Sequence, residues 1–336
     1  MSYGYLKVLF QMPRQNPDVI ALGCRVIDEQ GWVHIMDGAV MAFMKKHQLI
    51  KHNATVLIGV SGGADSLALL HFYVAIREEW NLNIVALSVD HQFRGDESRE
   101  DLLYVKKMCE KWDVAFEGTS IDVEAYGNER RIGTQLAARE VRYQFYSQEM
   151  NRYQAEFLAL GHHGDDQVET MFMGLVRSSS PKAISGIPII RPFSTGYIVR
   201  PFLCVTKDDI RNYCQVHHII PREDPSNEKT DYTRNYFRKK LIPIIKDKNN
   251  NIHTTIQRLS GSLQEDEHFL RNEAKKMVDE IVMFDESKKE VSLKIDTFIL
   301  YPSALQRRAY HLILSYLYGH SLPENLSYVH EELFFE

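Results

Sequence analysis

Short, continuously apolar runs alternate along the middle of the chain with longer segments whose apolar residues recur every three or four positions. The short runs cover residues 55–60, 84–89, 114–117 and 157–160, and the first two are rich in β-branched residues, as is typical of strands buried on both faces. The longer segments have the spacing of amphipathic helices and cover residues 66–80, 97–112, 133–150 and 165–176. This alternation predicts an α/β fold with a doubly wound, mostly parallel sheet, whose ligands bind beyond the carboxyl ends of the strands.

The flanking regions show different patterns. Two apolar runs at residues 19–26 and 32–36 surround a turn signal and predict a small hairpin, and residues 38–49 predict a short helix. Residues 178–203 are rich in Ser, Pro and Gly and predict a loop with one or two short strands. Residues 206–320 predict mostly helix.

The length of 336 residues is enough for about two domains. We expect an α/β domain over residues 38–225 and a second, smaller helical domain over residues 226–336. Residues 1–37 are expected to be an N-terminal extension of unknown role.

Composition narrows the class of protein. With 44% hydrophobic and 25% charged residues the chain is globular, and no apolar run approaches the roughly 20 residues that span a bilayer. No secretory signal is visible, so we expect a soluble cytoplasmic protein without a membrane partner. Cys24, Cys109, Cys204 and Cys214 form no C-x-x-C pair, which argues against disulfide, iron–sulfur and thiolate zinc frameworks.

The residues between the first predicted strand and helix are Ser61, Gly62, Gly63, Ala64, Asp65 and Ser66. Two glycines let the backbone turn tightly and approach an anion, and the start of a helix presents unpaired N–H groups. The hydroxyls add donors, and Asp65 could hold a magnesium ion that neutralises phosphate charge. A glycine-rich turn with a Ser or Asp helix cap is the alternative, but the position after a buried strand favours an anion-binding loop. The segment matches neither G-x-x-x-x-G-K-[ST] nor G-x-G-x-x-G.

Polar residues also follow the second predicted strand and lie on the third predicted helix. Asp90 and His91 come at the carboxyl end of the strand, where a parallel sheet places its ligands, or else form an Asp/His turn. Arg139 and Arg142 are three positions apart and share a helix face, which suits a clamp on phosphate or on a nucleic-acid backbone. Taken alone, the two arginines fit a solvated or salt-bridged face better.

An acidic cluster follows the fourth predicted strand. Asp166 and Glu169 share a helix face, and His162 comes just before the helix. This group could bind Mg²⁺, orient a cationic amine or accept its proton. Zinc is disfavoured because adjacent histidines point different ways and no H-x-E or C-x-x-C partner exists. A plain helix-capping cluster is the remaining alternative.

The formal net charge of −5 argues against a nucleic-acid partner, but charge is distributed unevenly along the chain. The basic residues of the segment 234–248 are Arg234, Arg238, Lys239, Lys240, Lys246 and Lys248, against the single acid Asp247. The resulting local charge of +5, interleaved with Tyr236 and Phe237, suits phosphate contact and base stacking on RNA. A solvated helix face is the alternative.

Together these segments resemble a known family. The loop at residues 61–66 is similar to the pyrophosphate loop of the ATP pyrophosphatase superfamily, which implies a fold like that of the adenine nucleotide alpha hydrolases. Further segments resemble tRNA(Ile)-lysidine synthetase, in the right order over about residues 38–320. They are Val89-Asp90-His91, Ala138-Arg139-Glu140, Leu160-Gly161-His162-His163-Gly164-Asp165-Asp166, Arg200-Pro201-Phe202-Leu203 and Arg234-Asn235.

The resemblance implies a two-step ligation on the wobble cytidine of a tRNA(Ile) with a CAU anticodon. ATP would adenylate the C2 oxygen with release of pyrophosphate, and free L-lysine would then displace AMP through its amine to form lysidine. The implied cofactors are ATP and Mg²⁺, and the implied partners are this tRNA and L-lysine. A homodimer is compatible with this interpretation.

The same resemblance assigns roles to individual residues. Those expected to bind ATP are Ser61, Gly62, Gly63, Ala64, Asp65, Ser66, Asp90 and His91. Those expected to act in catalysis are Asp65, Arg142, His162, Asp166 and Glu169, and the expected metal ligands are Asp65 and Asp166. Those expected to contact tRNA are Arg139, Arg177, Arg200, Arg234, Asn235, Arg238, Lys239 and Lys240.

Two other functions, tRNA thiolation and RNA binding without catalysis, fit parts of the sequence. tRNA thiolation enzymes of the superfamily usually use paired cysteines, which this sequence lacks. A non-catalytic RNA-binding protein would need none of the acidic cluster. The chain also departs from the family, since Ser178-Ser179-Ser180-Pro181 stands where a Gly-Ser-Gly turn is usual. Many bacterial members continue into a C-terminal domain that grips the tRNA, whereas this chain stops within or just past its helical part.

Overall fold

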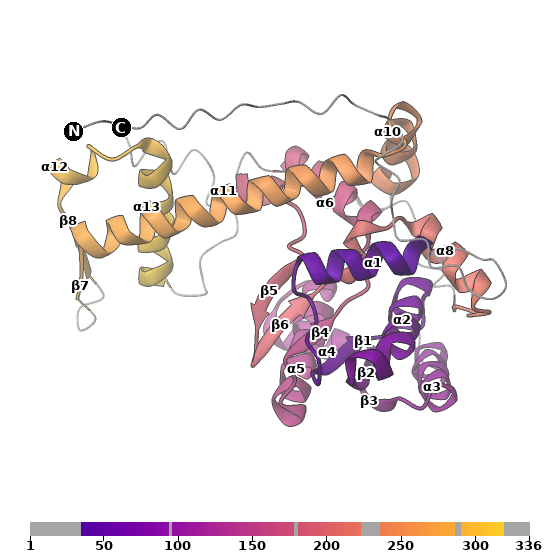
Figure 1. The fold of residues 1–336 in the computed structure, drawn as a ribbon. Helices are drawn as coiled ribbons and strands as arrows, with labels where there is room; N and C mark the ends of the chain where they lie inside the picture. Colours follow the sequence, from indigo (N-terminus) through magenta and orange to yellow (C-terminus); the bar gives the residue numbers. More distant parts are fainter. Residues whose placement is uncertain (1–34, 94–95, 178–180, 223–235, 286–289, 319–336) are drawn as a thin grey trace.

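The structure is a computed structural model that describes residues 35–93, 96–177, 181–222, 236–285 and 290–318 (Figure 1). Outside these ranges lie most of the hairpin predicted at residues 19–36, the serines of residues 178–180, and both Arg234 and Asn235.

The first described helix corrects the end of that hairpin. Helix α1 (Ile35–Lys46) includes residues 35 and 36, which the sequence placed in a strand, and it starts before the predicted helix at residues 38–49. Met36, Val40 and Met44 are all buried and stand four positions apart, so the apolar stripe that starts the helix begins at Met36.

Within the described residues a six-stranded sheet has the order β3-β2-β1-β4-β6-β5. Its strands are β1 (Thr55–Gly59), β2 (Asn83–Asp90), β3 (Ala115–Ser120), β4 (Phe157–Ala159), β5 (Ile190–Phe193) and β6 (Gly196–Val199). All neighbouring pairs are parallel except β5 and β6, which form an antiparallel hairpin at one edge. The prediction of a doubly wound, mostly parallel sheet is confirmed, and the chain order reverses between β1 and β4, where such sheets bind ligands.

Alternate residues of the central strands enter two different cores. Val56 and Ile58 of β1 pack with residues of α1 and of α2 (Ala64–Trp80). Leu57 packs instead with Tyr146 and Met150 of α5 (Thr134–Tyr153). Because successive strand residues point to opposite faces, helices cover both faces of the sheet, which explains why β1 is continuously apolar.

Shorter helices complete this part of the chain. They are α3 (Asp96–Lys111), α4 (Val123–Arg130), α6 (Gly164–Arg177), α7 (Pro181–Ile184), a 3₁₀ turn (Pro201–Cys204) and α8 (Lys207–Val216). Helix α4 was not predicted, because it buries only Val123 and Gly127 and has no apolar stripe; the Asp122 side chain caps it by accepting from Ala125 N–H (2.9 Å).

The second part of the chain is built on one long helix. A π-helical turn (Phe237–Leu241) and α10 (Ile242–Lys248) lead into the 30-residue helix α11 (Ile252–Ile281). The first half of α11 shares a small core with α6, formed by Val168, Met171, Ile242 and Ile256.

Figure 1 shows α11 running from α10, past α6, to a small group of elements at its far end. This distal module consists of β7 (Val282–Asp285), β8 (Glu290–Leu293), α12 (Ile295–Phe298) and α13 (Ser303–Tyr318). Its core includes Met277 and Ile281 of α11 with Phe298 and Ala309. The β7–β8 hairpin was not predicted inside this mostly helical region, and the domain division at residue 225 remains a prediction.

None of the helices in the described ranges combines the length and apolarity that crossing a membrane requires.

Candidate functional site

The loop between β1 and α2 is folded by its own serines. Ser61 N–H donates to Ser66 Oγ (3.1 Å), and Ser66 Oγ donates to the Gly63 carbonyl (3.0 Å). Gly62 has φ +86°, a left-handed conformation that favours glycine. Gly63 stands at the N-cap of α2 and has no side chain with which to cap it, so the first amides of the helix suit an anion rather than a capped turn.

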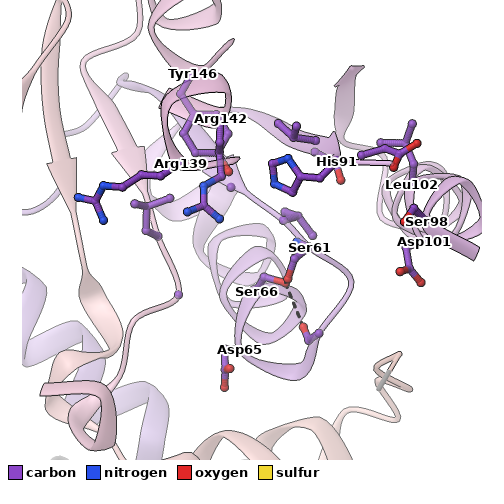
Figure 2. A pocket seen from close by; sticks show the side chains of 18 of the residues that line it. Ser61, Asp65, Ser66, His91, Ser98, Asp101, Leu102, Arg139, Arg142 and Tyr146 are labelled. Carbon is purple, nitrogen blue, oxygen red and sulfur yellow. Dashed lines mark hydrogen bonds between the residues drawn. The ribbon is translucent and has the colours of Figure 1, made fainter. Parts of the chain in front are cut away.

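This loop lines a cavity of about 400 Å³ at the carboxyl ends of β1, β2 and β4 (Figure 2). Helices α3 and α5 supply the remaining walls. The predicted site residues that line it are Ser61, Gly63, Asp65, Ser66, Asp90, His91, Arg139, Arg142 and His162. The structure therefore brings together four of the segments selected from the sequence, and the volume lies within the range of small-molecule sites.

Asp90 and His91 differ in what they can offer a ligand. The buried Asp90 carboxylate accepts from Gln92 N–H and from Ser120 Oγ, both at 2.8 Å, so it shapes the turn after β2. Burial, assisted by the charge of Arg142, lowers the pKa of His91 to about 4, so the ring is neutral at pH 7. Its buried Nδ1 has no hydrogen-bond partner among the described residues and is available to a bound molecule.

The two arginines of α5 reach different places. In Figure 2 the Arg142 side chain extends into the space between α5 and the loop, where its charge also acts on His91. Arg139 is exposed and extends to the side of the cavity, over the ring of Tyr143. Their spacing of three positions does place both on one helix face, as the sequence indicates.

Behind the loop, Asp65 is paired with a lysine that the sequence did not point to. Lys207 Nζ, at the start of α8, lies 2.6 and 2.7 Å from the two Asp65 carboxylate oxygens. The buried ring of His163 lies between two acids, with Nε2 3.8 Å from Asp65 Oδ1 and 3.5 Å from Asp166 Oδ2. Lys207 is 142 residues from Asp65, so no local spacing could have revealed the pair.

Asp165 joins three helices. Its Oδ2 accepts from Lys207 N–H (2.8 Å), and its Oδ1 lies 2.5 Å from Lys246 Nζ on α10. Burial raises the pKa of this carboxyl, but the hydrogen bonds from Lys246 and from the Lys207 backbone outweigh burial, and the pKa is lowered overall. Asp165 thus ties α6 to α8 and α10, a role that its position in the sequence does not indicate.

Glu169 and Asp166 are engaged by Arg238. Arg238 Nε and Nη2 lie 2.6 and 2.9 Å from the carboxylate oxygens of Glu169, and Nη2 lies 3.4 Å from Asp166 Oδ1. The Glu169 side chain is only 1% exposed. Burial lowers the pKa of Arg238, but the bonds to Glu169 and the nearby acids outweigh burial and raise it overall. Asp165, Asp166, Glu169, Lys207, Arg238, Lys246 and His163 are called the ion-pair cluster below.

The other residues predicted to contact tRNA are scattered. Arg177, Lys239 and Lys240 are exposed, at the end of α6 and on the π-helical turn. Arg200 is buried, and its Nη1 donates to the Pro188 carbonyl (2.5 Å), which places it inside the fold rather than on a surface. Arg238 points inward to Glu169, although the local charge count suggested an RNA-facing side chain.

The acidic side chains do not form a preassembled metal site. Across the described ranges, no three His, Cys, Asp or Glu side chains are grouped so as to hold a metal ion. Asp65 nevertheless lines the cavity beside the loop, where a ligand phosphate could supply further oxygen atoms. Asp166 is not among the lining residues and faces the His163 N–H (3.1 Å) and Arg238.

The mostly parallel sheet and the glycine-rich loop at its carboxyl edge are typical of nucleotide-binding α/β proteins. Comparison with known proteins supports this class. The model of the PP-loop domain family matches residues 36–245, more than half of the chain, so the chain belongs to the PP-loop family. In sequence it is similar to tRNA(Ile)-lysidine synthases. It is 46% identical to that of Oceanobacillus iheyensis over 89% of this chain and 64% of the relative, and 41% identical to that of Bacillus subtilis over 89% and 62%.

The chain thus spans less than two thirds of the length of these relatives. Among solved structures, a U34-tRNA thiolase, NcsA, from Methanococcus maripaludis aligns with a TM-score of 0.58 at 16% identity, over 68% of this chain and 78% of the thiolase. At that identity the likeness supports the fold alone.

Proposed function

We propose that this chain ligates L-lysine to the wobble cytidine of a tRNA(Ile) with a CAU anticodon at the expense of ATP. The observation that supports this most is the convergence of the loop at residues 61–66, His91, Arg142 and His162 on one cavity, in a chain 46% identical to a tRNA(Ile)-lysidine synthase. The location that follows from such a substrate is the cytoplasm.

In the first step the cytidine C2 oxygen attacks the α-phosphate of ATP, a new O–P bond forms, and pyrophosphate leaves. Negative charge moves across the phosphate oxygens during this step. The amides at the start of α2, the hydroxyls of Ser61 and Ser66, and the Arg142 guanidinium are positioned to stabilise it. Neutral His91 can hydrogen-bond the nucleoside without adding charge.

Mg²⁺ is expected with ATP, and Asp65 is the residue that fits it. Magnesium is usually held by one or two carboxylates together with substrate phosphates and water, and when bound here it would neutralise phosphate charge. Asp65 lines the cavity, although Lys207 neutralises it in this state, whereas Asp166 faces His163 and Arg238. We therefore assign the metal to Asp65 and reserve Asp166 for the second step.

In the second step the lysine side-chain amine attacks C2, the C2–O bond breaks, and AMP leaves. The free amine has a pKa of about 10.4, so it must lose a proton within the site. His162 lines the cavity, and Asp166 and Glu169 follow it on α6; we assign these three to orienting the amine and accepting its proton. Because Arg238 now occupies both carboxylates, the lysine ammonium has to replace the guanidinium there.

The test is lysine-dependent release of pyrophosphate from ATP in the presence of tRNA(Ile) with a CAU anticodon, with mass spectrometry of the tRNA for lysidine. Asp166→Asn should still bind tRNA but lose turnover. Asp208→Asn, an exposed acid on α8 paired with Arg211, is the matched control and should keep it. A requirement for a sulfur donor instead of lysine would indicate thiolation, and an absence of pyrophosphate would favour a binding protein.

A further inference from the structure

Three arginines gather around the Tyr143 ring at one side of the cavity. The guanidinium carbons of Arg139 and Arg191 each lie 5.2 Å from the ring centroid. Arg191 also lies 5.5 Å from the centroid of Phe193, whose ring meets Tyr143 edge-on at 5.5 Å. Arg200 is the third, and its charge acts on the Tyr143 hydroxyl.

The edge strand β5 explains this arrangement. Arg191 and Phe193 are two positions apart, so they share one face of β5. Phe193 on that face and Tyr143 of α5 both pack against the same core. The β5–β6 hairpin therefore brings two residues next to Tyr143, which itself lines the cavity.

The group carries uncompensated positive charge. In the part of the chain that the structure describes, no carboxylate lies within salt-bridge distance of Arg139 or Arg191. Burial raises the pKa of the Tyr143 hydroxyl, yet hydrogen bonding by Arg191 and the charges of all three arginines outweigh burial and lower the pKa overall. Arg152 near the other end of α5 also stacks on a tyrosine, but Glu117 and Glu149 neutralise it at 3.1 and 3.2 Å.

We propose that Arg139, Arg191 and the aromatic pair Tyr143 and Phe193 form a binding site for the phosphate backbone of single-stranded RNA. The single-stranded part of the substrate RNA would pass over this site on its way into the cavity. Stacking on Tyr143 holds both guanidinium groups in place, which reduces the entropy lost when they bind. The arginines provide the charge and planar donors that phosphates select.

A single strand fits this site better than a duplex or a free nucleotide. The two guanidinium groups flank one ring rather than following a helical groove, and aromatic side chains next to arginines are typical of sites for unstacked bases. Arg191 does not line the cavity, whereas Arg139 and Tyr143 do. The proposed binding site therefore extends from β5 into the cavity, toward the loop at residues 61–66. The inference rests on the proposed function in that the RNA is taken to be the substrate.

The test measures filter binding of tRNA(Ile) with a CAU anticodon to the full chain at two salt concentrations. Arg191→Ala should weaken binding about tenfold and make the salt slope shallower by about 0.7, the value for one phosphate contact on a single strand. Arg191→Lys should restore the slope but only part of the affinity. Arg152→Ala, on the same helix, is the control and should stay within about twofold of the parent, because its charge is already paired.

The result that overturns the site is Arg191→Ala binding tRNA with the affinity and slope of Arg152→Ala while thermal unfolding shows both variants folded. A loss of ATP binding equal to the loss of tRNA binding would assign Arg191 to the nucleotide instead and would also overturn it. Binding that depends on Arg191 without lysidine formation would keep the site and refute the proposed function. Lysidine formation with an unchanged tRNA KM in Arg191→Ala would do the reverse.

Discussion

The loop at residues 61–66 and the ion-pair cluster are neighbours, but they differ in whether a ligand can bind without displacing a resident side chain. Hydrogen bonds among the residues of the loop hold its shape. The N-cap of α2 is Gly63, which has no side chain to cap the first amides of the helix. In the cluster, the acids Asp165 and Glu169 each already face a lysine or an arginine within 2.6 Å. The loop can therefore receive an anion without rearrangement, whereas a cationic ligand at the cluster must exchange partners with resident side chains.

The largest expected effect concerns Asp65, where the two regions meet. Asp65→Asn removes the charge proposed to hold the metal, so pyrophosphate release should fall by about 100- to 1,000-fold while tRNA binding persists. Asp208→Asn serves again as the charge-matched control. Retention of more than half of the parent rate would show that the loop works without this carboxylate and would contradict the assignment.

Arg238→Ala should lower stability more than any surface charge change, because it removes the guanidinium that pairs with the buried Glu169 carboxylate. The expected loss is about 3 kcal/mol in the free energy of unfolding, measured by denaturant titration. Lys276→Ala breaks the exposed pair with Glu273 and should cost less than about 0.5 kcal/mol. Equal losses in the two variants would mean that the cluster is no more coupled to folding than the surface.

The free energy of unfolding should depend on pH through His91, which lines the cavity. Its pKa is lowered to about 4 in the folded chain, against about 6.5 when unfolded, so the unfolded state binds the proton more readily. The stability that neutral His91 contributes is present above pH 6.5 and is lost as the pH falls toward 4. Allowing for solvent screening, that loss is roughly 1 kcal/mol between pH 7 and 5.

Unfolding titrations at pH 7 and 5 on the parent and on His91→Gln check this. The variant should show a pH dependence smaller by about the same 1 kcal/mol. An identical pH dependence in the two proteins would exclude His91 as its source.

The smallest effect is expected at Lys207, which competes for Asp65. Lys207→Met frees the carboxylate, so nucleotide binding should reach half saturation at about threefold lower Mg²⁺. Lys248→Met, an exposed lysine on α10, is the control and should not change the Mg²⁺ dependence. A higher Mg²⁺ requirement in Lys207→Met would mean that the lysine assists the metal rather than competing with it.

The sequence predicts the loop at residues 61–66 and its flanking elements well, because the residues that form them are consecutive in the chain. Strand β1 and helix α2 end within two residues of the predicted segments, and the loop lies between them as expected. The ion-pair cluster was not predictable in the same way, since Arg238 and Glu169 are 69 residues apart. A charge count over residues 234–248 identifies the basic residues but does not indicate which side chain points inward. No pattern in the sequence indicates that Arg200 is buried.

Short elements were the other gap. The strands of the β7–β8 hairpin have four residues each, too few for an alternating pattern to stand out between two helices. The β5–β6 strands are equally short, yet the Pro, Gly and Ser around them indicated a loop with strands, as found.

Helix α11 has the dimensions of a lever arm between two cores. Its 30 residues extend about 45 Å at 1.5 Å per residue, and its near end is clamped to α6, the helix that carries Asp166 and Glu169. Because the first half of α11 packs against α6, about 22 Å of helix extends beyond that contact, and a tilt of about 5° there would displace the distal module by about 2 Å. Small angular adjustments beside the ion-pair cluster are therefore magnified at the far end, and load applied there returns to α6 as torque.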